Sequence, residues 1–140
     1  MIKVKKTPLD ILDDVYSLAY WMTGSEKDSQ DLVRQTYLFA GRKQKETDLL
    51  RVFRECYIET YGQDTEFCID EKACKGTVTL VDTLKQWAAD IKLTVLLSEI
   101  SGLGHRQIAS IVGKPIETVR QWLLTGRRLL VSDYILKASA

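Results

Sequence analysis

The chain has 140 residues, of which 45% are hydrophobic and 28% are charged, with a formal net charge of +1 at pH 7. This length holds one ordinary domain or two small ones with a packed core. The near-neutral charge argues against indiscriminate binding to polyanions. The lack of a long apolar run argues against a membrane span or a secretory signal peptide, so we expect a cytoplasmic protein.

Three helices are predicted in the first half of the chain, each followed by a glycine. The first covers residues 8–22. Ser25 is expected to cap the second, which ends at Gly41, and Thr47 is expected to cap the third, which Gly62 closes. Their apolar residues recur at helical intervals, so each helix should bury one face.

The second half is expected to form a separate helical domain. Residues 63–76 have little periodicity and are the predicted linker between a domain over 1–62 and a domain over 77–140. A fourth helix is predicted over 78–88, and Asp90 is expected to cap a fifth. Since no segment shows the strict alternation of a half-buried strand, the predicted fold is all-α, with two small helical domains.

Residues 102–123 read as a complete helix-turn-helix, a motif that places one helix in the major groove of DNA. Ile108, Ala109 and Val112 lie at helical spacing on a short first helix. Gly113-Lys114-Pro115 forms the turn, because glycine tolerates positive φ and proline is favourable at the start of a helix. An ordinary helical hairpin uses the same turn chemistry, and that alternative stays open.

The second helix of this motif has a core face and an outward face. Val119, Trp122 and Leu123 are expected to face the core. The outward residues are Glu117, Thr118, Arg120, Gln121 and Leu124, and the basic residues Lys114, Arg127 and Arg128 cluster on the same segment. These eight residues are the candidate DNA contacts, because their types include those that read base edges and pair with phosphates. Acidic residues gather instead near the start of the chain, which suggests that this end has a separate function from the basic segment.

The cysteines do not form a recognisable metal site. Cys56, Cys68 and Cys74 fit no paired spacing, and the single histidine, His105, lies far from them. We expect reduced thiols that are neither paired nor metal-bound, with Cys56 buried and the other two more accessible in the linker. No metal and no cofactor are expected.

Catalysis has almost no support in the sequence. There is one histidine, no glycine-rich loop that would cradle a phosphate, and no nucleophile beside a base. A solvated helix face explains the acidic pairs near the start of the chain. We therefore expect a binding protein without a small-molecule substrate, and not an enzyme.

Two segments are similar to one known family. The first contains Thr23-Gly24-Ser25 and Asp31–Leu38, and the second contains Leu96–Leu103, Ile108-Ala109, Gly113–Arg120 and Gly126–Leu130. In order and spacing they resemble region 2 and region 4 of the extracytoplasmic-function (ECF) sigma factors of bacterial RNA polymerase. The region-4 resemblance is the stronger of the two.

The resemblance implies two contact surfaces. The helix over residues 31–38 would dock on the polymerase clamp, with Asp31, Leu32, Gln35 and Thr36 as its contact residues. The helix over residues 118–128 would read the minus-35 promoter element. By position, Arg120 and Gln121 would meet bases, and Arg127 and Arg128 would meet phosphates. The implied partners are promoter DNA and core RNA polymerase, and an anti-sigma factor is left open.

The region-2 segment departs from the family pattern. Residues 39–47 are several residues shorter than in typical members, and the missing stretch includes the loop that captures an unpaired promoter base. Asp48 stands where the family has tryptophan, and Glu55 stands where it has asparagine. The charge of the clamp motif is altered by Gln30, Arg34 and Gln35. These departures are unfavourable for opening a duplex. The alternative is therefore a DNA-binding regulator or a sigma decoy that lacks promoter melting.

Overall fold

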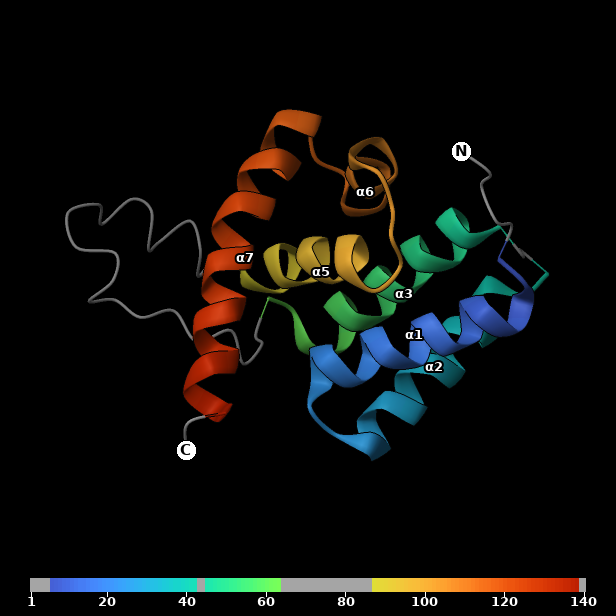
Figure 1. The fold of residues 1–140 in the computed structure, drawn as a ribbon. Coiled ribbons are helices and arrows are strands. Elements are labelled where there is room, and N and C mark those ends of the chain that lie inside the picture. Colours follow the sequence, from blue (N-terminus) through green and yellow to red (C-terminus); the bar gives the residue numbers. More distant parts are fainter. Residues whose placement is uncertain (1–5, 43–44, 64–86, 139–140) are drawn as a thin grey trace.

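The computed structural model describes residues 6–42, 45–63 and 87–138, with residues 129–138 described by their backbone alone. In these ranges all regular structure is helical, which confirms the predicted all-α fold (Figure 1). The helices are α1 (Pro8–Thr23), α2 (Glu26–Ala40), α3 (Glu46–Tyr61), α5 (Ala88–Glu99), α6 (His105–Val112) and α7 (Ile116–Ala138). None of the helices in the described part of the chain combines the length and apolar character needed to cross a membrane.

Short polar side chains and a glycine set the ends of the first two helices. At the start of α1, the Asp10 backbone N–H donates to Thr7 Oγ1 at 3.1 Å, and the Thr7 N–H donates to Asp10 Oδ2 at 3.0 Å. The hydrogen bond from the Thr7 backbone lowers the pKa of the Asp10 carboxyl. Gly24, with φ 69°, ends α1, and Ser25 caps α2 by accepting from the Asp28 N–H at 3.3 Å, as predicted.

Two of the predicted caps are wrong. Thr47 lies inside α3, which begins at Glu46 after Lys45, and the side chain of Lys45 makes no capping hydrogen bond. Asp90 lies inside α5, which begins at Ala88. A polar residue in the first turn of a helix resembles a cap in sequence, because both positions favour carboxylates and hydroxyls.

The first three helices form the N-terminal unit, in which α2 packs against both α1 and α3. Val15 and Leu18 of α1 and Phe53 of α3 are fully buried between them. The Tyr57 hydroxyl of α3 donates to the Met22 carbonyl of α1 at 3.3 Å. This unit is held mainly by apolar burial, the dominant favourable term in folding.

The last three helices form the C-terminal unit, built around α5. Every residue of α5 from Ala88 to Leu97 is buried. Helix α7 crosses α5 closely at Gly126, where a β-carbon would stand only 2.5 Å from Val95 Cγ2 and 3.2 Å from Ile91 Cγ2. The missing side chain of Gly126 thus lets the two helices approach.

The two units pack directly against each other and share one hydrophobic core. Helix α1 contacts α5, and α3 contacts α6 (Figure 1). Arg54 of α3 donates two hydrogen bonds to the fully buried carboxylate of Asp90, at 2.7 and 3.0 Å, and the Gln63 amide adds a third at 2.9 Å. The predicted domain boundaries and linker stay predictions, because residues 64–86 lie outside the described ranges. The same holds for the helix predicted over 78–88, of which Ala88 alone is described, as the first residue of α5.

Candidate nucleic-acid interface

Helices α6 and α7 are joined by the three-residue connection Gly113 to Pro115. Gly113 adopts φ 68°, and its N–H donates to the Ala109 carbonyl at 2.9 Å. The Lys114 N–H donates to the same carbonyl at 3.2 Å, and the Val119 N–H donates to the Pro115 carbonyl at 3.1 Å. The left-handed glycine thus ends α6 and the proline leads into α7, as the sequence predicts.

Each of the two helices buries one apolar face. On α6 the buried residues are Ile108, Ala109, Ile111 and Val112, and on α7 they are Val119, Trp122 and Leu123. The Trp122 ring lies 6.2 Å from the ring of Trp87, centroid to centroid. The prediction that Trp122 packs in the core is therefore confirmed.

The opposite face of α7 is an exposed stripe. It consists of Glu117, Arg120, Gln121, Leu124, Arg127 and Arg128, all exposed and all among the eight candidate DNA contacts. Leu124 is 68% exposed, although it is a large apolar side chain. The other two candidates, Lys114 and Thr118, are half-buried beside the stripe. All eight therefore lie on one continuous segment of the surface.

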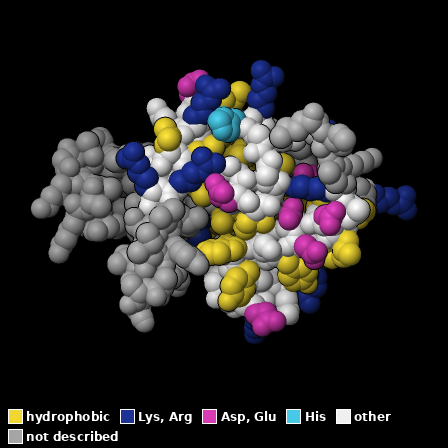
Figure 2. Space-filling model, in the orientation of Figure 1, with side chains coloured by type: hydrophobic (Ala, Val, Ile, Leu, Met, Phe, Trp, Pro, Cys, Tyr) yellow, Lys and Arg dark blue, Asp and Glu magenta, His cyan; other side chains and the backbone are white. Residues whose placement is uncertain are grey.

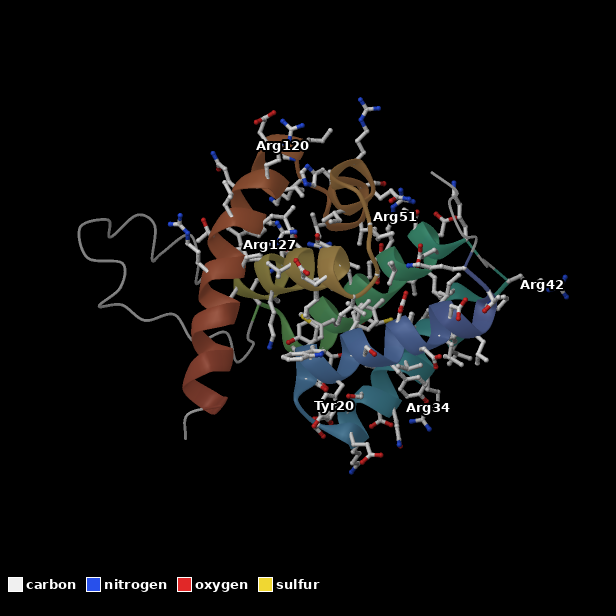
Figure 3. All side chains as sticks on the ribbon, viewed as in Figure 1. Tyr20, Arg34, Arg42, Arg51, Arg120 and Arg127 are labelled. Carbon is white, nitrogen blue, oxygen red and sulfur yellow. The ribbon has the colours of Figure 1, made fainter. Side chains whose placement is uncertain are left out.

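Contacts within the protein already engage three cations of this segment. Arg120 pairs with Glu117 at 3.4 Å, and Lys114 Nζ lies 3.6 Å from the centroid of the Trp87 ring. Arg127 donates to Glu99 Oε1 and to Ser98 Oγ, both at 2.9 Å, which fixes its guanidinium against the end of α5 (Figure 3). Arg127 would have to exchange these acceptors for a phosphate, whereas Arg120 is held only by a long, exposed pair.

Two exposed residues that were not among the candidate DNA contacts lie on the neighbouring helix. His105 and Arg106 begin α6 and are exposed. Lys and Arg side chains gather over α6 and α7 in the upper part of the molecule, while carboxylates are more frequent over α1 to α3 (Figure 2). The signal for Arg106 was present in the sequence, since the apolar spacing of Ile108, Ala109 and Val112 leaves Arg106 on the outward face of the same helix.

The residues expected to contact polymerase divide into two groups. Gln35 is exposed and Asp31 is half-exposed, with a 2.8 Å ion pair to the exposed Arg34. Leu32 is 3% exposed and Thr36 is fully buried, and the Thr36 hydroxyl donates to the Leu32 carbonyl at 2.7 Å. Thr36 was expected to be free to touch a partner, but its side chain belongs to the core of the N-terminal unit.

An apolar surface on the same helix was missed. Leu38 is 75% exposed and Phe39 is 70% exposed, next to Tyr37 at 36%. The helical spacing of α2 already placed Leu38 and Phe39 away from its buried stripe, so the pattern could have revealed them. Arg34 of α2 and Arg120 of α7 lie at opposite ends of the molecule, so the two candidate surfaces are separate (Figure 3).

The connection between α2 and α3, where the sequence departs most from the ECF sigma-factor pattern, is short. Helix α2 ends at Ala40 and α3 begins at Glu46, so five residues, 41–45, join them. Asp48 pairs with Arg51 at 2.9 Å, and Arg51 also donates to the Ser110 carbonyl of α6 at 3.3 Å. Asp48 therefore forms an ion pair within α3, with the arginine that contacts α6.

One of the three cysteines can be placed. Cys56 is buried and free, and burial raises the pKa of its thiol. This agrees with the expectation of a buried Cys56, and a raised pKa makes the thiol less reactive. Cys68 and Cys74 lie outside the described residues. Within the described ranges, no three His, Cys, Asp or Glu side chains are grouped so as to hold a metal ion.

Comparison with known proteins gives one informative match. No protein-family model matches the chain. Over 99 residues the chain is 29% identical to the ECF RNA polymerase sigma-E factor of Haemophilus influenzae, and the alignment covers 69% of this chain and 52% of that protein. The chain spans about half the length of this curated relative. At low identity, and over about two thirds of its length, the chain is thus similar to an ECF sigma factor.

Proposed function

We propose that this chain is a sigma-like transcription initiation protein that binds core RNA polymerase and promoter minus-35 DNA in the cytoplasm, without chemistry of its own. The observation that carries the proposal is the exposed stripe on α7. Arg120, Gln121 and Arg128 stand on it beside a short helix and a three-residue turn. The similarity to an ECF sigma factor supports the same function.

In this proposal α6, the turn and α7 act as a helix-turn-helix. Helix α7 enters the major groove, where Arg120 and Gln121 reach base edges and the exposed Leu124 contacts a thymine methyl group. Arg128 and the exposed Arg106 of α6 pair with phosphates, which orients the protein without reading sequence.

Polymerase binds to the outer face of α2. Asp31 and Gln35 supply polar groups, and the exposed Leu38 and Phe39 supply apolar area that would be buried on docking. A protein interface of this kind needs an apolar centre with a polar rim. Leu32 and Thr36 do not contact polymerase directly in this proposal, because their side chains are buried and pack α2 against the rest of the N-terminal unit.

The connection between α2 and α3 favours a second candidate function. Its five residues leave little chain for a pocket that would hold an unpaired base, and the carboxylates of Asp48 and Glu55 follow it on α3. Because carboxylates repel the phosphate backbone, this surface is unfavourable for single-stranded DNA. The second candidate is therefore a DNA-binding regulator or sigma decoy that does not melt promoters.

A co-retention assay tests recruitment directly. Labelled duplex DNA from upstream of the protein's own gene is passed over immobilised core RNA polymerase, with and without the chain. We expect DNA to be retained only when the chain is present, and this retention to be lost with Arg120→Ala. DNA binding without polymerase would favour the regulator, polymerase binding without DNA would favour the decoy, and absence of both would exclude both candidates.

A further inference from the structure

Three aromatic side chains are exposed together on α1. Tyr16, Tyr20 and Trp21 are 42%, 55% and 45% exposed. Single exposed aromatic residues are common, but a contiguous group of them marks an interaction site. With Ser17 of α1 and Glu26, Ser29 and Gln30 of α2, they line a hollow of about 340 Å³.

The charge of this hollow is negative. Glu26 is its single ionisable side chain apart from the tyrosines, since neither a lysine nor an arginine is among the lining residues. The helices that form it, α1 and α2, carry six Asp and Glu residues against two Lys and Arg residues. Apolar side chains are visible over this lower part of the molecule, with a carboxylate beside them (Figure 2). Aromatic ring faces carry negative charge density, so rings and carboxylate together attract a cation.

We propose that this hollow binds the guanidinium of an arginine side chain presented by a protein partner. A guanidinium is planar and weakly hydrated, so it can stack on the faces of Trp21 and Tyr20 while it donates two hydrogen bonds to the Glu26 carboxylate. The Gln30 side-chain carbonyl and the tyrosine hydroxyls are further acceptors for its remaining N–H groups. A lysine ammonium loses more hydration energy and presents no flat face, so arginine fits better.

The hollow lies away from the proposed DNA-contacting face. Tyr20 is at the lower end of α1, whereas Arg120 is at the upper end of α7 (Figure 3). A partner seated on Tyr20 and Trp21 therefore leaves the stripe on α7 open. Stacking of unpaired DNA bases on the same rings is disfavoured, because the surrounding carboxylates repel the phosphates. The inference does not depend on the proposed function, since its test uses the isolated chain without polymerase or promoter DNA.

The test follows the indole N–H signal of Trp21 by NMR in the full-length chain, with Trp21→Leu used to identify that signal. The probes are N-acetyl-arginine amide, its neutral isostere N-acetyl-citrulline amide, tetramethylammonium chloride and a short oligothymidine. We expect a saturable shift with the arginine probe, and little or none with citrulline or oligothymidine. Glu26→Gln should weaken arginine binding by about three- to tenfold, the loss of one charge-assisted contact at an exposed residue. Tyr37→Leu, which removes an exposed tyrosine of α2 outside the hollow, should bind like the original chain.

Several results would overturn the proposal. Equal shifts with arginine and citrulline, or no effect of Glu26→Gln, would show that charge is not recognised. Saturation by tetramethylammonium alone would assign the hollow to a small quaternary ammonium ligand, and saturation by oligothymidine would assign it to nucleic acid. Absence of any saturable arginine shift up to about 50 mM would exclude a functional arginine site. Circular dichroism of each variant confirms that it remains helical.

Discussion

At the scale of single residues, Gly126 decides how closely α7 approaches α5. Its backbone lies so near Val95 and Ile91 that a β-carbon would overlap the Val95 side chain at 2.5 Å. Both neighbours are buried, so neither can move into solvent. We expect Gly126→Ala to lower the free energy of unfolding by about 1–3 kcal/mol, because overpacking outweighs the gain in helix propensity. Urea denaturation followed by circular dichroism measures the change.

Thr125→Ala is the matched control for Gly126. Thr125 is the preceding residue of α7 and is partly exposed. Its replacement should change stability by less than about 0.5 kcal/mol, as at most surface positions. If Gly126→Ala were as stable as the original protein, the close crossing of α5 and α7 would be incorrect.

The second decisive residue is Asp90, whose buried carboxylate binds Arg54 and Gln63 from the N-terminal unit. The hydrogen bond from Arg54 to Asp90 raises the pKa of that guanidinium, which keeps it charged. Asp90→Asn leaves a partly buried cation without its counter-charge, a change that costs about 3–5 kcal/mol in comparable buried pairs. Thermal unfolding should show a large loss of stability.

A surface pair provides the comparison for Asp90. Asp31 pairs with Arg34, and their side chains are 45% and 76% exposed. Asp31→Asn should change the unfolding free energy by less than about 1 kcal/mol, because water and salt already screen this pair. A similar loss in Asp31→Asn and Asp90→Asn would contradict the burial of Asp90.

Individual residues were predicted unevenly from the sequence. Ser25 and Gly113 were assigned correctly, because a cap or a left-handed turn depends on neighbouring residues alone. Asp90 was wrongly predicted as a cap, because its partners Arg54 and Gln63 lie far away in the sequence. Thr36 was wrongly predicted as exposed, because helical spacing defines only approximately which residues of α2 are buried. Hydrophobic periodicity predicts which face of a helix is buried, but it does not predict how completely a neighbouring helix covers each residue of that face.

At the scale of elements, the exposed stripe of α7 predicts different effects for its arginines. Arg120→Ala should weaken binding to the specific promoter site by about 1–3 kcal/mol and binding to random DNA very little, because it removes the proposed base contact. Arg128→Ala should weaken both DNAs similarly and reduce the salt dependence, because it removes the proposed phosphate contact. Fluorescence anisotropy with both DNAs at several salt concentrations separates the two effects.

Equal losses for both variants on both DNAs would contradict the division between base and phosphate contacts. Glu99→Gln provides an additional check. It frees Arg127 from its 2.9 Å pair with Glu99, so it should strengthen binding to both DNAs.

The outer face of α2 gives the matching prediction for polymerase. Asp31→Lys should reduce retention of the chain by core polymerase while leaving its helical content unchanged, because the residue is on the surface and reverses a charge at the proposed contact. Glu59→Lys makes the same charge reversal at an exposed position of α3 and should be retained normally. If both variants are retained like the original protein, α2 is not the docking surface.

Helices themselves were more predictable than their contacts. Helices α1, α2, α3 and α6 each end at the residue directly before a glycine, and these ends could be predicted because a glycine with positive φ interrupts the helical hydrogen bonds. The exposed face of α7 followed from the spacing of its buried residues. The aromatic hollow between α1 and α2 was not foreseen, because it depends on how the two helices meet.

At the scale of the whole molecule, Lys6 links three elements. Its ammonium donates to Asp14 of α1 at 3.1 Å, to Glu46 of α3 at 2.7 Å, and to the Ser101 carbonyl that follows α5. Burial lowers the pKa of Lys6, but the hydrogen bonds to Glu46 and Asp14 outweigh it and raise the pKa above the usual 10.5. A raised pKa in the folded state gives stability that is complete below the unfolded-state value and is lost as the pH rises through the folded-state value.

The comparison of the original chain with Lys6→Met tests this contribution. The original chain should be the more stable near pH 7, and the difference should shrink as the pH rises above the usual 10.5 and through the raised pKa of Lys6 in the folded state. Chemical denaturation over a series of pH values measures it. A difference that did not depend on pH would mean that Lys6 acts through packing alone.

The two units share one core, so the surfaces on α2 and α7 have a fixed relative position in this structure. The sequence predicted two separate domains, and the contacts between them could not be read from it, because they pair residues 27, 36 and 59 positions apart. Both candidate surfaces face outward from this joined molecule (Figure 3). The geometry is therefore compatible with simultaneous contact to polymerase and DNA.

Run-off transcription tests the central claim most directly. Core RNA polymerase and the chain are combined with two templates that carry the promoter from upstream of the protein's own gene, one fully paired and one with a premelted bubble at the minus-10 region. We expect a product from the bubble template that depends on the chain and on Arg120, and a weak product from the paired template, because the bubble removes the cost of unpairing. No chain-dependent product from either template would contradict a role in initiation, and strong product from paired DNA without an activator would contradict the loss of promoter opening.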